Sequence, residues 1–371
     1  MVIDETYPTL PEIFHAQTTS NLKDLPYIYF KPERGKPYQK ITYGEFGKKV
    51  IELAGAFATH GINRGDRIAL ISESRPEWLE TDFASSLLGV ITVPMFPTLT
   101  ASQVEYVVHH SGAKAIVVSN DLQLGKAVKA AASCPELEKI FVMNKDCSAR
   151  PESVAPIIHF EELITQRSEI DVEALVARSK PDDIITMIYT SGTTGTPKGV
   201  MLTNRNLVSN VEGSLASLPP IGHNDIFLSF LPLSHGFERT ASNFIFYSGC
   251  AIAFAESIDT ISDNMLEIRP TIMTGVPRFY ERIHSRLMRS REKLSPFKQK
   301  MFDWALSVGA ECAKKLEGGN PPLGALLMRP VADKLVLKKI RERTGGRMRF
   351  FISGGAALSS EVGKAFASFG L

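Results

Sequence analysis

A run of ten small and polar residues at 190–199, TSGTTGTPKG, is the segment of this sequence best suited to chemistry. It contains three glycines, four threonines, one serine, one proline and a single lysine. Glycine lets the backbone approach a ligand and turn N–H groups toward it, hydroxyls donate to phosphate oxygens, and lysine offsets their charge. Because a strand-to-strand connection needs only about two to five residues, we expect a polyphosphate-binding loop. Composition alone leaves a flexible surface hairpin as the alternative.

The spacing within this loop excludes two widespread phosphate-binding patterns. A Walker A loop has four residues between its glycines and then Gly-Lys-Ser/Thr. Here Gly192 and Gly195 are separated by two residues, and Lys198 lies between Pro197 and Gly199. A dinucleotide-binding GxGxxG pattern is missing as well. The loop is therefore neither of the kinase and GTPase type nor of the dinucleotide type.

Both sides of the loop, and much of the chain before it, have the patterns of regular secondary structure. DIITMIY (183–189) and VMLT (200–203) are expected to be buried strands. Strand-like and helical patterns alternate before them, which predicts a parallel-rich sheet covered by helices on both faces. The expected strands are 66–72, 90–96, 114–120 and 138–143, and the expected helices are 42–61, 76–89, 100–112 and 121–133. Capping-box spacings begin two of these helices, Thr42 with Glu45 and Thr100 with Gln103.

We expect an N-terminal α/β lobe over 1–143, a connector and helix over 144–183, and a phosphate-loop α/β lobe over 184–371. Further elements are expected near 160–179, 204–217 and 359–370 as helices, and at 226–231, 250–255, 271–275 and 348–355 as strands. The mostly helical excursion at 278–349 carries 18 Lys and Arg against 7 Asp and Glu, a net charge of about +11. A solvated helical face is the simple interpretation, and the other hypothesis is a peripheral contact with anionic lipid.

Composition places the chain among ordinary globular proteins. Its 371 residues are 44% hydrophobic and 22% charged, so a sizeable core can form. The net charge of +2 says little about partners, and we expect no nucleic-acid partner. The four cysteines are scattered, with no CxxC pair and no histidine at metal-ligand spacing, which favours a reducing compartment. There is no secretory signal pattern, and the longest apolar stretch, 83–96, is too short to span a bilayer. We expect a soluble cytoplasmic protein, with any membrane association peripheral.

Residues 190–199 resemble, throughout, the phosphate loop of the adenylate-forming, AMP-producing acyl-CoA synthetases, Ser/Thr-Ser/Thr-Gly-Thr-Thr-Gly-x-Pro-Lys-Gly. Other segments extend the resemblance over nearly the whole chain and point to the long-chain fatty acid–CoA ligase branch. They are RPEWLETDFASSLLGVITVPMFPTLTASQVEYVVHHSGAKAIVVS (75–119), FLPLSHGFERT (230–240), TGVPRFYERI (274–283) and SGGAALSSEV (353–362). The family usually has Ala-Pro where Ala356-Ala357 stand, and often histidine at Asn204. The fold implied is the large N-terminal domain of an adenylate-forming enzyme, with sub-lobes.

This resemblance implies a two-step reaction with ATP and Mg²⁺ as cofactors and coenzyme A as co-substrate. A fatty-acid carboxylate attacks the α-phosphorus of ATP and releases pyrophosphate, and the coenzyme A thiol then attacks the acyl-adenylate and releases AMP. Hydrogen-bond donors and cations around the departing pyrophosphate lower the barrier. The residues implied to bind the nucleotide are Thr190, Ser191, Gly192, Thr193, Thr194, Gly195, Lys198, Gly354, Gly355 and Ala356.

Catalytic roles fall by resemblance on Lys198, Thr194 and His235. Thr194 would also bind Mg²⁺, together with a glutamate beyond the end of the chain. His235 is expected where the acyl and adenylate pockets meet, although a lone histidine is otherwise more often a hydrogen-bonded core residue. The residues expected to line the acyl pocket are His235, Phe237, Gly275 and Val276. The aromatic gate of some relatives would fall on Arg239 and is not expected here, and Ser359 is expected to cap the final helix.

The resemblance also implies parts that this chain lacks. The family's magnesium-binding glutamate, its ribose-binding aspartate and its mobile C-terminal domain with a catalytic lysine would all follow Leu371. We therefore expect a truncated N-terminal portion that is inactive as a ligase alone. The alternatives are a fatty acyl-AMP ligase that passes its product to a carrier protein, and a non-enzymatic nucleotide-binding fragment.

Overall fold

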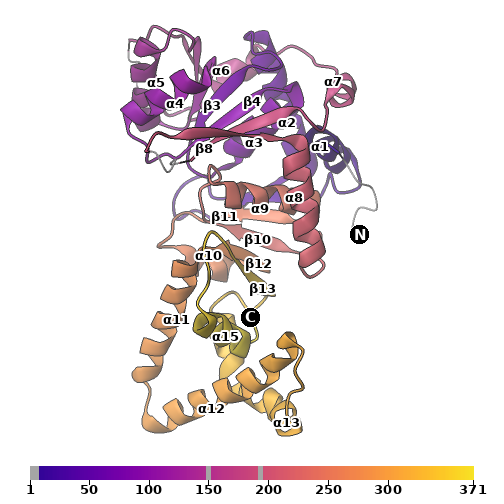
Figure 1. Cartoon of the computed structure of the whole chain (residues 1–371), viewed down its shortest axis with the longest axis vertical. Helices are drawn as coiled ribbons and strands as arrows, with labels where there is room; N and C mark the ends of the chain where they lie inside the picture. Colours follow the sequence, from indigo (N-terminus) through magenta and orange to yellow (C-terminus); the bar gives the residue numbers. More distant parts are fainter. Residues whose placement is uncertain (1–7, 148–151, 191–194) are drawn as a thin grey trace. The chain divides into compact units, whose positions relative to one another are not determined.

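The computed structural model describes residues 8–147, 152–190 and 195–371 (Figure 1). The chain divides into two compact units. Unit 1 comprises Met1–Phe30, Gln39–His223 and Pro232–Ala251, and unit 2 comprises Lys31–Tyr38, Asn224–Leu231 and Ile252–Leu371. The lobe boundaries predicted from the sequence stay a prediction. Along the described residues, no helix combines the length and apolar character needed to cross a bilayer.

Unit 1 alternates strands and helices over most of its length, as the sequence pattern predicts. Its elements are α1 (Leu10–Thr19), β1 (Pro26–Phe30), β2 (Gln39–Thr42), α2 (Tyr43–Thr59), β3 (Arg67–Ile71), α3 (Pro76–Leu88), β4 (Ile91–Met95), α4 (Ala101–Ser111), β5 (Ala115–Val118), α5 (Asp121–Ser133), β6 (Lys139–Val142), β7 (Ile157–His159), α6 (Phe160–Thr165), α7 (Val172–Arg178), β8 (Ile184–Thr190), β9 (Lys198–Thr203), α8 (Asn204–Ser217) and α9 (Gly236–Tyr247). The expected single helix near 160–179 is two helices, α6 and α7, separated by six residues that include the cap Asp171.

The main sheet of unit 1 has seven strands in the order β7-β6-β5-β3-β4-β8-β9. All its pairs are parallel except β8 with β9, which confirms the expected parallel-rich sheet. Side chains alternate between the faces of a strand. Ile140 and Val142 of β6 join the core beneath α4 and α5. Phe141 between them faces the opposite side, where its ring centroid lies 5.3 Å from that of Phe57 in α2. Helices therefore cover both faces, as predicted.

Unit 2 contains a smaller set of strands and a group of helices. Its elements are β10 (Ile226–Ser229), β11 (Ala251–Phe254), α10 (Ile261–Ile268), β12 (Ile272–Gly275), α11 (Pro277–Glu292), α12 (Pro296–Ala313), the 3₁₀ helix η1 (Lys314–Glu317), α13 (Leu323–Ala332), the π-helical turn η2 (Asp333–Leu337), α14 (Lys338–Glu342), β13 (Phe350–Ser353) and α15 (Ser360–Phe369). The strands lie in the order β13-β12-β10-β11, and β12 is parallel to both β10 and β13.

The helices of unit 2 enclose their own hydrophobic core. Tyr280 of α11, Phe302 of α12, Val336 of η2 and Phe366 of α15 all belong to it. The Tyr280 hydroxyl donates to the backbone oxygen of Ile352 at 2.9 Å and thereby joins α11 to β13. The basic excursion expected over 278–349 is thus a packed helical layer whose charged residues remain on its outside.

Candidate active site

The predicted phosphate loop connects the two strands of a β-hairpin. β8 and β9 are antiparallel, with Thr190 opposite Lys198 and Tyr189 opposite Gly199. β8 also pairs with β4, so the hairpin forms one edge of the seven-stranded sheet. Gly195 has a φ of +85°, in the region that favours glycine. The predicted site residues Ser191, Gly192, Thr193 and Thr194 lie outside the described residues.

Two side chains of α4 contact the base of this loop. The Tyr106 hydroxyl donates to the backbone oxygen of Pro197 at 2.9 Å, and Nδ1 of His110 lies 2.7 Å from the Tyr189 hydroxyl. Burial, with a smaller contribution from Tyr106, raises the pKa of Tyr189 to about 12, so its phenol stays neutral at physiological pH. The sequence predicted this helix but not its role, because the two contacts join residues 91 and 79 positions apart.

The strand that follows the loop differs from its prediction. VMLT was expected to be buried, but β9 is the edge strand of the sheet, and Val200 and Met201 are 45% and 57% exposed. Lys198 at its start is also exposed and has no acidic partner within the described ranges. A Cβ at Gly199 would lie 2.7 Å from the sulfur of Met187, so the glycine leaves room for that side chain. Lys198 is available to a ligand.

His235 is the N-cap of α9. The backbone N–H of Phe237 donates to Nδ1 of His235 at 3.2 Å. When Nδ1 accepts a hydrogen bond, the proton of a neutral imidazole is on Nε2, which is then a donor. The residue is exposed, so the simple interpretation as a core histidine is wrong. Phe237 is half-buried in the first turn of α9, and its predicted place in an acyl pocket stays a prediction.

Arg239, one helical turn after His235, is buried at 2% exposure. Its Nε lies 3.1 Å from Oδ2 of Asp82 and its Nη2 lies 2.5 Å from Oδ1, while Nη1 donates to the hydroxyl of Thr186 in β8. Its guanidinium also lies 5.8 Å from the Trp78 ring. An arginine held in this way has a structural role, and the expectation that this position carries no aromatic gate stays a prediction.

In unit 2 the structure brings together four of the predicted residues. The backbone N–H of Gly354 donates to the oxygen of Gly275 at 3.1 Å. Gly355 has a φ of +82°, and a Cβ there would lie 3.9 Å from Cγ1 of Val276. A Cβ on Gly275 would lie 2.9 Å from the Tyr280 ring and hydroxyl. Small residues here leave backbone accessible, as a flat ring resting on the chain requires.

Two serines lie beside these glycines. Ser359 is the N-cap residue of α15, at the position expected for it, although its side chain makes no capping hydrogen bond. Ser353 was not predicted as a site residue. Its hydroxyl is buried and finds no hydrogen-bond partner among the described residues. Ser353 lies at the end of β13, directly before Gly354. Ala356 is exposed in the turn that follows.

The structure also places one histidine, one cysteine and one glutamate together, which the sequence spacing did not predict. The ligand atoms of His109, Cys134 and Glu136 lie within 4.8 Å of one another. His109 Nδ1 is 2.8 Å from a Glu136 carboxylate oxygen. Burial raises the pKa of the Cys134 thiol, which opposes the thiolate that zinc needs. The hydrogen-bonded His–Glu pair accounts for this arrangement.

Comparison with known proteins identifies the family of this chain. Residues 15–370 match the family of AMP-binding enzymes. The chain is 33% identical over 330 residues to the peroxisomal long chain acyl-CoA synthetase 6 of Arabidopsis thaliana, covering 88% of this chain and 45% of that protein. It is 30% identical over 364 residues to fatty acyl-CoA synthetase A of Dictyostelium discoideum, covering 95% and 52%.

Among solved structures, the chain is similar to the adenylation domain of a carboxylate reductase from Mycobacterium chelonae. The TM-score is 0.76 at 21% identity, and the match covers 100% of this chain and 57% of that one. At this identity the likeness shows the fold, which is that of the N-terminal domain of adenylate-forming enzymes. The chain spans about half the length of the curated relatives it matches. The family match and the fold together confirm the resemblance first seen in the loop: the chain belongs to the AMP-binding, adenylate-forming enzyme family.

Proposed function

We propose that this chain supplies the nucleotide and acyl sites of an ATP-dependent long-chain fatty acid–CoA ligase. The observation that carries the proposal is the family match over residues 15–370, which includes the glycine- and threonine-rich loop. Long-chain fatty acids as substrates are supported by relatives at about 30% identity whose names specify long-chain or fatty acyl groups. The coenzyme A step is proposed for the whole ligase, since this chain spans about half the length of those relatives.

In the first step the fatty carboxylate attacks the α-phosphorus of ATP, and the bond to pyrophosphate breaks. Lys198 and the hydroxyls and N–H groups of the loop would hold the β- and γ-phosphates and stabilise the charge that the leaving group gains. Nε2–H of His235 would donate to the carboxylate or to an α-phosphate oxygen. Thr194 would hold Mg²⁺, which supplies further positive charge to the phosphates when bound. Gly354, Gly355 and Ala356 would lie against the adenine.

Calorimetry on the 371-residue chain tests the nucleotide part of this proposal. Lys198→Ala removes a charge-assisted hydrogen bond worth about 1.5–3 kcal/mol, so ATP affinity should fall by about 10- to 150-fold. A palmitoyl-adenylate analogue lacks the β- and γ-phosphates, and its affinity should change little. Lys36→Ala removes an exposed lysine of unit 2 and is the matched control. Failure of the unaltered chain to bind both ligands would overturn the proposal and favour a non-enzymatic fragment.

Product analysis separates the ligase from its enzymatic alternative. ATP–pyrophosphate exchange with palmitate should be negligible for these 371 residues alone, because they span only about half the length of the curated relatives. A longer protein that contains those segments should convert palmitate, ATP and coenzyme A to palmitoyl-CoA. Accumulation of palmitoyl-AMP with no thioester would identify a fatty acyl-AMP ligase instead.

A further inference from the structure

A row of apolar side chains is exposed along the helices of the basic segment. α13, η2 and α14 follow one another without a break from Leu323 to Glu342. Leu323, Leu327, Val331 and Leu335 are spaced by four residues and are 73%, 64%, 46% and 41% exposed. Residues four apart are neighbours on a helix surface, so these four side chains follow one another in an apolar stripe that winds slowly around the helix. Contiguous exposed apolar surface on a protein marks an interaction site.

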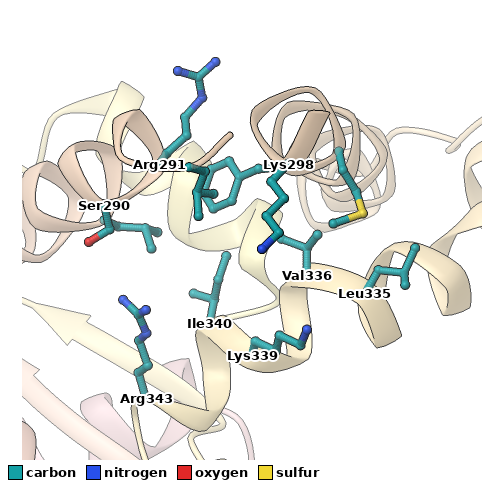
Figure 2. Close-up of a pocket in the computed structure, with 12 residues that line it drawn as sticks. Ser290, Arg291, Lys298, Leu335, Val336, Lys339, Ile340 and Arg343 are labelled. Carbon is teal, nitrogen blue, oxygen red and sulfur yellow. The ribbon is translucent and has the colours of Figure 1, made fainter. Parts of the chain in front are cut away.

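The apolar stripe ends at a pocket of about 280 Å³ within unit 2 (Figure 2). Leu335 lines the pocket, and the spacing of four continues through Lys339 and Arg343, which line it too. Figure 2 shows Lys298 of α12 extending toward Val336, with Lys339 and Arg343 on the other side of the pocket. The apolar part of the lining consists of Leu287, Leu294, Met301, Phe302, Leu335, Val336 and Ile340. The pocket therefore has an apolar interior and cations at its edge.

Three of these cations have no acidic partner among the residues that the structure describes. They are Lys298, Lys339 and Arg343, and all three are exposed. Arg291, also at the pocket, differs because its guanidinium forms two hydrogen bonds with Asp303, one of them at 2.6 Å. The surrounding segment, 278–349, has a net charge of about +11, whereas the remaining residues sum to about −9. Positive charge is thus concentrated where the apolar surface is exposed.

We propose that the apolar stripe and the pocket form a surface that binds a bilayer containing anionic phospholipid. The stripe would enter the boundary between headgroups and acyl chains, while Lys298, Lys339 and Arg343 contact headgroup phosphates. A nucleic acid would satisfy the cations but leave the stripe in water. An uncharged apolar partner would cover the stripe but leave the cations without counter-charges. The inference rests on this surface alone and does not depend on the proposed ligase activity.

Vesicle co-sedimentation of the full 371-residue chain tests the proposal. The vesicles are pure phosphatidylcholine, or phosphatidylcholine with about a third phosphatidylglycerol, and salt should weaken binding to the anionic ones. Lys339→Gln/Arg343→Gln should reduce affinity for the anionic vesicles by roughly 25-fold, at about fivefold per cation. The matched control Arg34→Gln/Lys36→Gln removes two exposed cations outside the segment and should bind as the unaltered chain does.

A second pair of variants tests the apolar part. Leu327→Ser/Val331→Ser should weaken binding to the anionic vesicles, whereas Leu122→Ser/Val154→Ser, which alters residues 68% and 83% exposed in unit 1, should not. Equal binding to neutral and anionic vesicles, or equal loss in test and control variants, would overturn the proposal. So would sedimentation velocity showing that Leu327→Ser/Val331→Ser breaks a dimer while vesicle binding is unaffected, since the stripe would then bind a second copy.

Discussion

Replacing Arg239 by methionine should strongly destabilise unit 1. The Arg239 side chain is 2% exposed and that of Asp82 is 5% exposed, and two hydrogen bonds join the guanidinium to both carboxylate oxygens. Removing the arginine leaves the Asp82 carboxylate buried and unpaired, which typically costs about 3–5 kcal/mol. Because a domain is stable by only about 5–15 kcal/mol, one substitution should remove a large part of the free energy of unfolding.

A double-mutant cycle separates the ion pair from general packing. Asp82→Asn/Arg239→Met removes both charges together, so the double variant should be more stable than Arg239→Met and the coupling energy should be about 3 kcal/mol. The Thr186 hydroxyl also donates to the backbone oxygen of Thr92 at 2.8 Å, so loss of Arg239 does not by itself leave that hydroxyl without a partner. Arg205→Met is the control, because Arg205 and Asp182 form an exposed pair whose loss should matter little.

Urea unfolding followed by tryptophan fluorescence gives the measurement. Trp78 lies beside the Arg239 guanidinium and reports on unit 1, and Trp304→Phe in every variant removes the signal of unit 2. The reasoning fails if the free energy of unfolding of Arg239→Met lies within about 1 kcal/mol of that of its parent, since losses of that size are typical of exposed ion pairs. It also fails if the double variant is no more stable than the single one.

Two further changes follow from buried contacts. Burial raises the pKa of Glu80 from its usual 4.5 to about 7, although Lys49 at 3.4 Å opposes the shift. The Glu80 carboxyl then binds its proton more tightly in the folded than in the unfolded chain, so protonation stabilises the folded state. This stabilisation is fully present below pH 4.5 and is lost as the pH rises through 7. The free energy of unfolding of Glu80→Gln, measured by urea titration relative to the unaltered chain, should therefore rise by about 3 kcal/mol between pH 4.5 and pH 8. A difference in unfolding free energy that stays constant with pH would contradict the pKa shift. Gly199→Ala would place a methyl carbon 2.7 Å from a methionine sulfur of β8 and should cost about 1–3 kcal/mol. An unchanged urea midpoint would show that this methionine moves aside without strain.

Local patterns predicted the elements that position the site, because helix and strand formation depends largely on neighbouring residues. The capping box at Thr42 forms both of its hydrogen bonds, with the Glu45 N–H donating to the Thr42 hydroxyl at 3.2 Å and the Thr42 N–H to the Glu45 carboxylate at 2.8 Å. The expected strands and helices on either side of the loop are present. The order of residues in the loop was specific enough to identify the family, which the comparison confirms.

Contacts between distant segments could not be predicted in the same way. Nothing in the sequence near Pro197 indicates that Tyr106 donates a hydrogen bond to it, and an apolar strand such as VMLT does not show whether it will lie at a sheet edge. Arg239 is the clearest case. A basic residue in a helix is usually exposed, and its burial follows only from Asp82, which lies 157 residues earlier in the chain.

The position of Arg239 links the two predicted site elements of unit 1. It lies four residues after His235 on α9, and the hydroxyl it binds, that of Thr186, lies four residues before Thr190 on β8. The same guanidinium therefore fixes both the helix whose N-cap is His235 and the strand that leads into the loop. Because the pair is buried and bonded through all three nitrogens, it resists the side-chain rotation that a gate would require. We therefore expect access beside His235 to be set by the surrounding backbone rather than by a moving side chain at this position.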